Sequence, residues 1–183
     1  MRIVVSGTHA SGKSTLISDF SVRHPEFAVL PDPFELVDEA WDDPNAGLFA
    51  TQLRLSASRL HPDESAEQFI AERGPIDFLA YLHALDELAG TSVSRDLLKR
   101  SESITREALQ HVDLLVVLPL TTMDGIAAGA DEHLALRDAM NDALLDLIDD
   151  PDVVGERPEV VEITGNRNQR LAAIEALAVG PSR

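Results

Sequence analysis

The feature that most constrains this chain is a glycine-rich octapeptide that directly follows its first apolar run. Residues 2–6 (RIVVS) predict a short buried strand, and residues 7–14 (GTHASGKS) fit the pattern G-x-x-x-x-G-K-[ST] in full. An amphipathic helix is predicted from about Lys13 to Val22. In such a unit, glycines let the backbone approach an anion closely, and the helix directs its positive end at the same anion. The alternative is a flexible glycine turn without a ligand, which the placement between a strand and a helix disfavours.

The pattern assigns roles to the groups within this segment. Backbone N–H groups would hold phosphate oxygens, Lys13 would reach the β- and γ-phosphates, and the Ser14 hydroxyl would bind Mg²⁺. His9 occupies a variable position of the loop, of the kind that often faces the substrate. The predicted nucleotide-binding residues of this segment are Gly7, Thr8, His9, Ala10, Ser11, Gly12, Lys13, Ser14 and Thr15. The sequence therefore predicts a protein that binds ATP together with Mg²⁺.

Short apolar runs alternate with helical patterns along the rest of the chain. Strands are predicted at residues 2–6, 27–30, 68–71, 112–118 and 160–163. Further helices are predicted near residues 48–60, 76–89, 93–110, 131–148 and 167–178. This alternation predicts an α/β fold of three layers, in which helices flank a five-stranded parallel sheet. We expect one domain at residues 1–179, with a lid segment near 122–133, and a tail at 180–183.

Charge and cysteine content exclude several classes of function. A net charge of −17 over 183 residues argues against a general affinity for nucleic acid or anionic membranes. The chain has no cysteine, which excludes disulfides and thiolate zinc sites. No apolar run approaches the roughly 18 to 20 residues that a membrane-spanning helix needs, and no signal-peptide cleavage region follows the first residues. A cytoplasmic location is the simplest expectation.

Three segments resemble P-loop kinases of the deoxynucleoside and thymidylate kinase type. They are GTHASGKST at 7–15, PDPFELVDEAW at 31–41 and ERGPIDFLAYL at 72–82. The chain is still more similar to uncharacterised ATP-binding (AAA-domain) relatives of that group, which resemble the ribosylnicotinamide-kinase domain. The resemblance covers nearly the whole chain, although only the phosphate loop is highly specific. It implies an ATP-dependent kinase that acts on a small hydroxyl-bearing metabolite such as a nucleoside or a nucleotide.

The resemblance implies roles for two acidic pairs that follow the second and third predicted strands. Asp32, which precedes a proline, would be the general base for the substrate hydroxyl, with Glu35 as the substitute candidate. Glu72 would help to hold Mg²⁺ through water, and Arg73 would bind the phosphoryl region with its fork of donors. The alternatives are that Asp32 caps a turn and that Arg73 forms a structural salt bridge. The predicted catalytic residues are Lys13, Asp32 and Arg73.

The helix near residues 48–60 resembles the substrate-side helix of these kinases. It carries Gln52, Arg54 and Arg59, and its alternative interpretation is a solvated helix face. Trp41 would line the same pocket or cover the core. Asp77, five residues after Glu72, is a weaker polar candidate. The predicted substrate-binding residues are Asp32, Gln52, Arg59 and Arg73.

The segment after the last predicted strand stands where relatives hold the adenine ring with backbone groups. Its candidates for nucleotide binding are Gly165, Asn166 and Arg167. The guanine-specifying N-K-x-D pattern is absent from the chain, which favours ATP over GTP.

One stretch departs from the kinase pattern. Relatives carry arginines in a lid over the phosphates, whereas residues 123–132 (MDGIAAGADE) contain no basic residue. Arg137 is the lid candidate, and its alternative role is to pair with acids on its own helix. Because such an arginine can be worth about 10³–10⁵ in rate, two further hypotheses stay open. One is a slow ATPase or nucleotide-dependent switch that acts through a protein partner, and the other is a nucleotide-binding protein without catalysis.

The expected partners are ATP and a small acceptor, and the resemblance also allows a homodimer through helices near 76–110.

Overall fold

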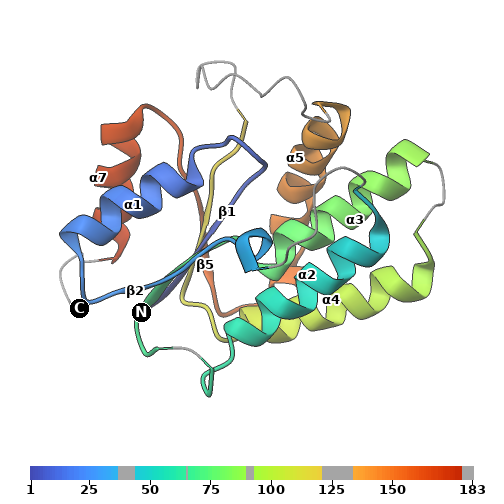
Figure 1. Ribbon diagram of the computed structural model, residues 1–183, viewed down its shortest axis with the longest axis horizontal. Helices are drawn as coiled ribbons and strands as arrows, with labels where there is room; N and C mark the ends of the chain where they lie inside the picture. Colours follow the sequence, from blue (N-terminus) through green and yellow to red (C-terminus); the bar gives the residue numbers. More distant parts are fainter. Residues whose placement is uncertain (37–43, 65, 90–92, 121–133, 179–183) are drawn as a thin grey trace.

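The computed structural model describes residues 1–36, 44–64, 66–89, 93–120 and 134–178. Within them, five parallel strands form one sheet in the order β2-β3-β1-β4-β5 (Figure 1). The strands are β1 Arg2–Ser6, β2 Ala28–Leu30, β3 Phe69–Glu72, β4 Leu114–Val117 and β5 Glu159–Glu162. The predicted α/β fold with a five-stranded parallel sheet is confirmed.

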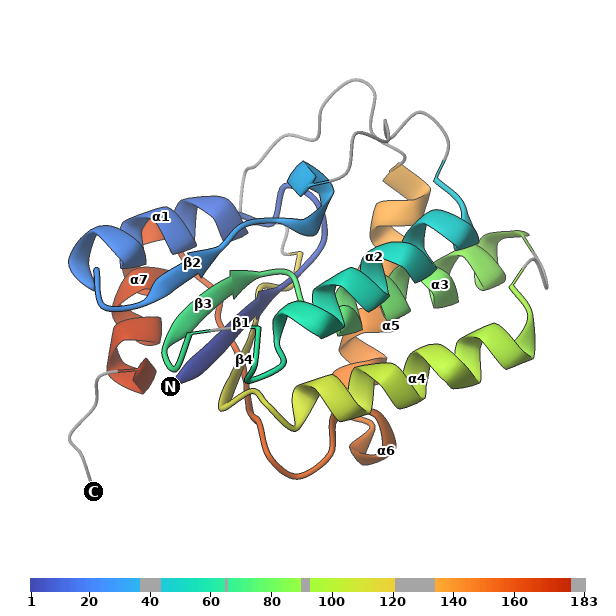
Figure 2. The ribbon, with the colours of Figure 1, turned by 60° about the horizontal axis from the view of Figure 1, so that its bottom comes forward.

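Helices cover both faces of this sheet (Figures 1 and 2). Helices α1 and α7 lie on one face, and helices α2, α3, α4 and α5 lie on the other. The helices are α1 Lys13–Arg23, α2 Ala46–Arg59, α3 Pro75–Ala89, α4 Arg95–Leu109, α5 Leu134–Ile148, α6 Pro151–Val154 and α7 Arg167–Ala178, and a 3₁₀ turn, η1, spans Pro33–Leu36. In the described part of the chain, no helix combines the length and the apolar character that a bilayer crossing requires.

Side chains of the central strand alternate between two separate cores. In β1, Ile3 and Val5 pack with residues of α1 and α7, whereas Val4 packs with residues of α2, α3, α4 and α5. This alternation follows from the two-residue period of a strand. Burial on both faces explains why the strand sequence is a continuous apolar run rather than an alternating one.

The element boundaries differ from the sequence prediction in small but explicable ways. The fourth strand covers Leu114–Val117 rather than 112–118. Its carboxyl end coincides with that of its neighbour β1, because Val117 pairs with Ser6, the last strand residue before the glycine loop. Helix α6 was not predicted, since its four residues are too few to show a helical period. Its first turn is capped by Asp150, whose side chain accepts a hydrogen bond from the backbone N–H of Asp152. The predicted lid near 122–133 and Trp41 lie outside the described residues.

A fully buried carboxylate, that of Asp77, joins the ends of β1 and β3. It lies in the first turn of α3 and is 0% exposed. One oxygen accepts hydrogen bonds from Ser6 Oγ at 2.6 Å and from the Gly74 N–H at 2.9 Å. The other oxygen accepts one from the Gly7 N–H at 2.9 Å. The start of the glycine loop is therefore fixed to the segment that leaves β3.

We expect Asp77→Ala to lower the free energy of unfolding by about 3 to 5 kcal/mol, because it leaves several buried donors without an acceptor. Urea unfolding followed by circular dichroism measures this change. Asp19→Ala is the matched control, since Asp19 pairs with the exposed Arg167 at the surface and its loss costs little. Equal unfolding midpoints for the two variants would contradict a central role for Asp77.

Candidate active site

A pocket of about 620 Å³ lies at the carboxyl ends of β1, β2 and β3. This edge of a parallel sheet is where ligands bind in open α/β folds. The pocket brings together the predicted phosphate loop, the predicted general base and the predicted metal ligand. Its lining residues are His9, Ala10, Gly12, Lys13, Ser14, Thr15, Asp32, Phe34, Glu35, Glu72 and Arg73.

The loop between β1 and α1 has a backbone that requires glycine at both glycine positions of the motif. At Gly7, an added Cβ would lie 2.7 Å from the Leu118 carbonyl oxygen, and at Gly12 the backbone is left-handed with φ 91°. Gly12 is also the N-cap of α1 and has no side chain to accept a hydrogen bond from the first turn. The first N–H groups of the helix are thus available to an anion in the pocket.

Lys13 is 3% exposed, and its ammonium group is held inside the loop. Nζ donates a hydrogen bond to the Thr8 carbonyl oxygen at 2.6 Å. Burial lowers the pKa of Lys13 to about 7, with a further decrease from Arg73 and a partial offset from nearby carboxylates. Near neutral pH the group therefore exchanges between its charged and neutral forms, and an incoming phosphate would favour the charged form.

Ser14 and Glu72 form the oxygen pair predicted to hold Mg²⁺. Ser14 Oγ donates a hydrogen bond to Glu72 Oε1 at 2.7 Å, and both residues line the pocket. Burial raises the pKa of Glu72, whereas the hydrogen bond from Ser14 and the charge of Lys13 oppose that increase. A hydroxyl and a carboxylate are hard ligands of the type that Mg²⁺ prefers, and Mg²⁺ completes its shell with water and phosphate. These two residues fit the ion.

Arg73 and Asp32, which both line the pocket, form a close ion pair. Arg73 Nε donates to Asp32 Oδ2 at 2.7 Å, and Nη1 of the same guanidinium donates to the Gly7 carbonyl oxygen at 3.1 Å. The guanidinium lies over the rings of Phe34 and Tyr81, 5.6 Å and 5.9 Å from their centroids. The second oxygen of Asp32 accepts a hydrogen bond from the Phe34 N–H at 3.0 Å. Asp32 therefore caps a turn and Arg73 forms a salt bridge, as the two alternative interpretations of the sequence predict. Both residues also line the pocket.

The backbone of Arg73 is strained. Its φ is 64°, in the left-handed region that non-glycine residues rarely occupy. Its N–H donates to the Val5 carbonyl oxygen at 3.1 Å, and the Ser56 hydroxyl donates to its carbonyl oxygen at 3.4 Å. Such conformations cost about 1–3 kcal/mol and gather at functional sites. The side chain of this strained residue is part of the pocket lining.

The three predicted polar residues of helix α2, Gln52, Arg54 and Arg59, differ in their burial and contacts. Gln52 is 0% exposed, and neither its side-chain oxygen nor its nitrogen has a hydrogen-bond partner among the described residues. Arg59 donates from Nη1 to the Pro31 carbonyl oxygen at 2.9 Å, so it supports the segment that carries Asp32. Arg54 is exposed. The solvated-face interpretation therefore describes Arg54 and is wrong for Gln52.

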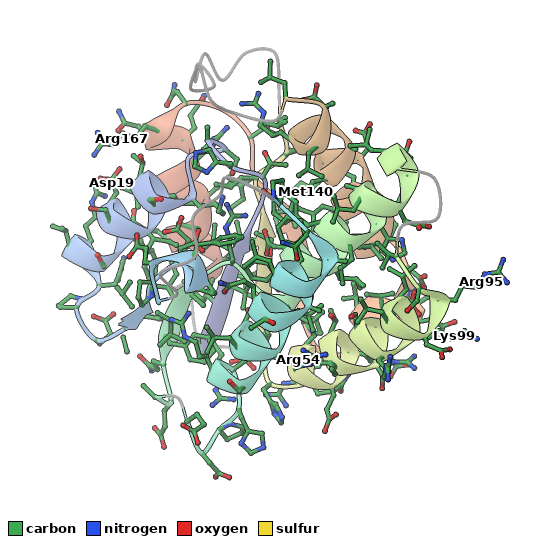
Figure 3. All side chains as sticks on the ribbon, turned by 45° about the vertical axis from the view of Figure 1, so that its right-hand side comes forward. Asp19, Arg54, Arg95, Lys99, Met140 and Arg167 are labelled. Carbon is green, nitrogen blue, oxygen red and sulfur yellow. The ribbon has the colours of Figure 1, made fainter. Side chains whose placement is uncertain are left out.

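The base-side candidates lie at the start of α7, outside the lining of this pocket. Gly165 has a left-handed backbone with φ 100°, and Asn166 Oδ1 accepts hydrogen bonds from the backbone N–H groups of Asn168 and Gln169. Arg167 forms a two-pronged ion pair with Asp19 of α1 at the outer surface (Figure 3). Their roles in nucleotide binding stay predictions, as does that of Arg137, which is half-buried on α5.

Sequence reasoning missed Phe34, which lines the pocket, and it also missed Arg170. Arg170 is buried on α7 and contacts both the phosphate loop and the loop at Gly165. The sequence does contain a signal for its burial. Arg170 stands one helical turn before the buried Ile174 and next to the buried Leu171, so it belongs to the apolar face of the helix. A charged residue on the apolar face of a helix indicates a specific buried partner.

Comparisons of the sequence with protein-family models and with curated proteins found no match. Comparison of the structure with solved structures found several with the same fold. Deoxyadenosine kinase from M. mycoides with bound dATP has a TM-score of 0.71 at 14% identity, over 98% of this chain and 100% of that chain. Thymidylate kinase from Candida albicans has a TM-score of 0.63 at 16% identity, over 97% and 90% of the two chains.

A third similar structure is the NadR protein in complex with NR, with a TM-score of 0.63 at 16% identity. It matches 97% of this chain and 50% of that chain. At these identities the likeness establishes the fold. The chain thus has the three-layer fold of P-loop nucleoside and nucleotide kinases, as its sequence resemblance predicted.

Proposed function

We propose that this chain is an ATP-dependent kinase that transfers the γ-phosphoryl group to a hydroxyl of a small, nucleoside-like acceptor. The observation that carries the proposal is one pocket in which a phosphate loop with a buried lysine faces an ion-paired carboxylate and arginine. Phosphoryl transfer needs little covalent chemistry from the protein, and positioning and charge account for most of its catalysis. The pocket holds the groups for both tasks.

On the donor side, the N–H groups at the start of α1 and the Lys13 ammonium bind the triphosphate. To do so, Lys13 exchanges the Thr8 carbonyl oxygen for phosphate oxygens. Ser14 and Glu72 hold Mg²⁺, which supplies charge neutralisation for the phosphates when it is bound. Arg73 offsets negative charge on the transferred group, and its ring contacts with Phe34 and Tyr81 fix its plane.

On the acceptor side, Asp32 orients and deprotonates the attacking hydroxyl. A carboxylate can accept about four hydrogen bonds, and Phe34 N–H and Arg73 Nε each supply one to Asp32. Acceptor capacity is therefore left for a substrate hydroxyl. Arg59 supports this position by holding the Pro31 carbonyl oxygen, one residue before Asp32.

We further propose that the amide of Gln52, which is not among the residues that line the pocket, pairs with a nucleobase of the acceptor. Its donor and its acceptor are both desolvated and unpartnered among the described residues, which costs free energy unless a ligand pairs with them. An amide offers one donor face and one acceptor face side by side, which matches the edge of a base. The similar solved structures bind dATP and NR, which is consistent with a nucleoside-like ligand.

A slow ATPase or nucleotide-dependent switch is the second candidate function. It is favoured by the lack of any basic residue between residues 123 and 132 in the sequence. Release of ADP, measured with and without a panel of nucleosides, nucleotides and sugars, separates the two. A kinase shows turnover that one class of acceptor stimulates, whereas a rate indifferent to every acceptor would favour the ATPase.

We expect Asp32→Asn to reduce acceptor-dependent turnover by about 10²–10⁴, because the amide cannot take the proton of the hydroxyl. ATP affinity should change little, since Asp32 faces the acceptor. Coupled measurement of ADP release and calorimetry of ATP binding test both statements. Asp63→Asn, at a side chain that is 87% exposed, is the control and should retain full turnover. Full turnover in Asp32→Asn together with its loss in Glu35→Gln would move the base to Glu35.

We expect ATP binding at pH 8 to take up close to one proton, because the pKa of Lys13 is about 7 in the free protein and phosphates raise it. At pH 6 the lysine is already charged, so proton uptake by this group should vanish, and affinity should fall as pH rises above about 7. Calorimetry in two buffers of different ionisation enthalpy measures the protons. Lys13→Met should abolish the uptake, whereas Lys99→Met, on the outer surface of α4, should not (Figure 3). Identical proton uptake in wild type and Lys13→Met would refute the assignment.

A further inference from the structure

Arg170 is a buried arginine of α7 that donates hydrogen bonds to two separate loops. It is 5% exposed. Nη1 donates to the Ser11 carbonyl oxygen of the phosphate loop at 2.7 Å, and Nε donates to the Gly165 carbonyl oxygen at 2.8 Å. One rigid guanidinium thus spans the loop that follows β1 and the loop that follows β5. These loops are far apart in sequence, and helices α1 and α7, which continue from them, lie side by side (Figures 1 and 2).

The contact with Ser11 fixes the direction of a peptide group at the pocket. A trans peptide is planar, so its carbonyl oxygen and the N–H of the next residue point in opposite directions. Arg170 and Ser11 do not line the pocket, whereas Gly12 does. A Ser11 carbonyl held toward Arg170 therefore keeps the Gly12 N–H pointed away from Arg170, in a residue that lines the pocket.

The contact with Gly165 fixes the second loop, which is also ordered from within. Gln169 Oε1 accepts a hydrogen bond from the Asn166 N–H at 2.9 Å. An added Cβ at Gly165 would lie 2.7 Å from that same Oε1 atom. The loop is consequently a compact unit, and Arg170 connects this unit to the phosphate loop.

We propose that Arg170 is a positioning residue that couples the loop at residues 164–167 to the phosphate loop, so that the base and the phosphates of one nucleotide are bound in a fixed relation. The inference rests on the proposed nucleotide-binding function and adds to it a residue outside the pocket. Arginine suits the task because its planar fork donates in two fixed directions, whereas the lysine ammonium is a point charge on a flexible stem. The coupling acts on ligands that reach both loops.

The test compares ATP with inorganic tripolyphosphate, which can reach only the phosphate loop. Dissociation constants are measured by calorimetry in Mg²⁺ buffer for wild type and Arg170→Met, below the melting temperature of each. We expect ATP to bind about 5–150-fold more weakly to the variant, in the range of typical coupling between sites. Tripolyphosphate affinity should fall by a smaller factor, about two- to threefold, because the Gly12 N–H loses its support while the loop at residues 164–167 plays no part in binding this ligand. A purely structural role would lower the melting temperature without changing the ratio of the two affinities.

Two further variants keep the test decisive. Arg170→Lys retains the positive charge and replaces Arg170→Met if that variant does not fold. It should again weaken ATP binding more than tripolyphosphate binding. Arg23→Met is the matched control, because Arg23 of α1 also joins α7, through an exposed pair with Glu175, and should leave both affinities unchanged. Equal losses for ATP and tripolyphosphate, or no loss for either, would overturn the coupling while leaving nucleotide binding intact. Absence of ATP binding in wild type would overturn the proposed function and the coupling with it.

Discussion

The carboxylate of Asp77 is the interaction on which the rest of the site depends. It satisfies the Ser6 hydroxyl and the N–H groups of Gly7 and Gly74 where β1 and β3 end. Burial raises the pKa of Asp77, and the nearby Arg73 and Lys13 oppose that increase. A buried acceptor with so many donors holds the entrance of the phosphate loop and the strained turn at Arg73 in one frame. Both sides of the pocket are therefore built on the same buried group.

Within the pocket, the groups that we propose to bind ligands form hydrogen bonds to protein atoms. Lys13 donates to a loop carbonyl, Ser14 donates to Glu72, and Arg73 donates to Asp32. A nucleotide with its Mg²⁺ would replace the first two of these contacts, so the net gain from each new hydrogen bond is modest. Asp32 keeps acceptor capacity for a substrate hydroxyl beside its bond from Arg73. These pairings avoid the cost of isolated charges in the interior.

Local patterns in the sequence predicted most of the fold, whereas the pairings within the site needed the structure. The strand, glycine loop and helix at residues 2–23 are encoded by adjacent residues, and the alternation of elements then determined a parallel sheet. The burial of Gln52, the ion pair of Arg73 with Asp32 and the two contacts of Arg170 join residues far apart in the chain. Hydrophobic periodicity carries no information about which polar groups meet in this way. The resemblance to kinases brought Asp32 and Arg73 forward separately, but not the contact between them.

The order of strands in the sheet also determines where the side chains of the pocket lie relative to one another. Asp32 follows β2, Arg73 follows β3 and the phosphate loop follows β1, and these strands are consecutive neighbours. Adjacent strands lie about 4.8 Å apart, a spacing that backbone hydrogen bonds hold nearly constant. The sheet thus sets the intervals between Asp32, Arg73 and the phosphate loop, which we propose to contact the acceptor, the transferred group and the donor. A change of register or strand order would misplace the reacting groups even if every side chain were kept.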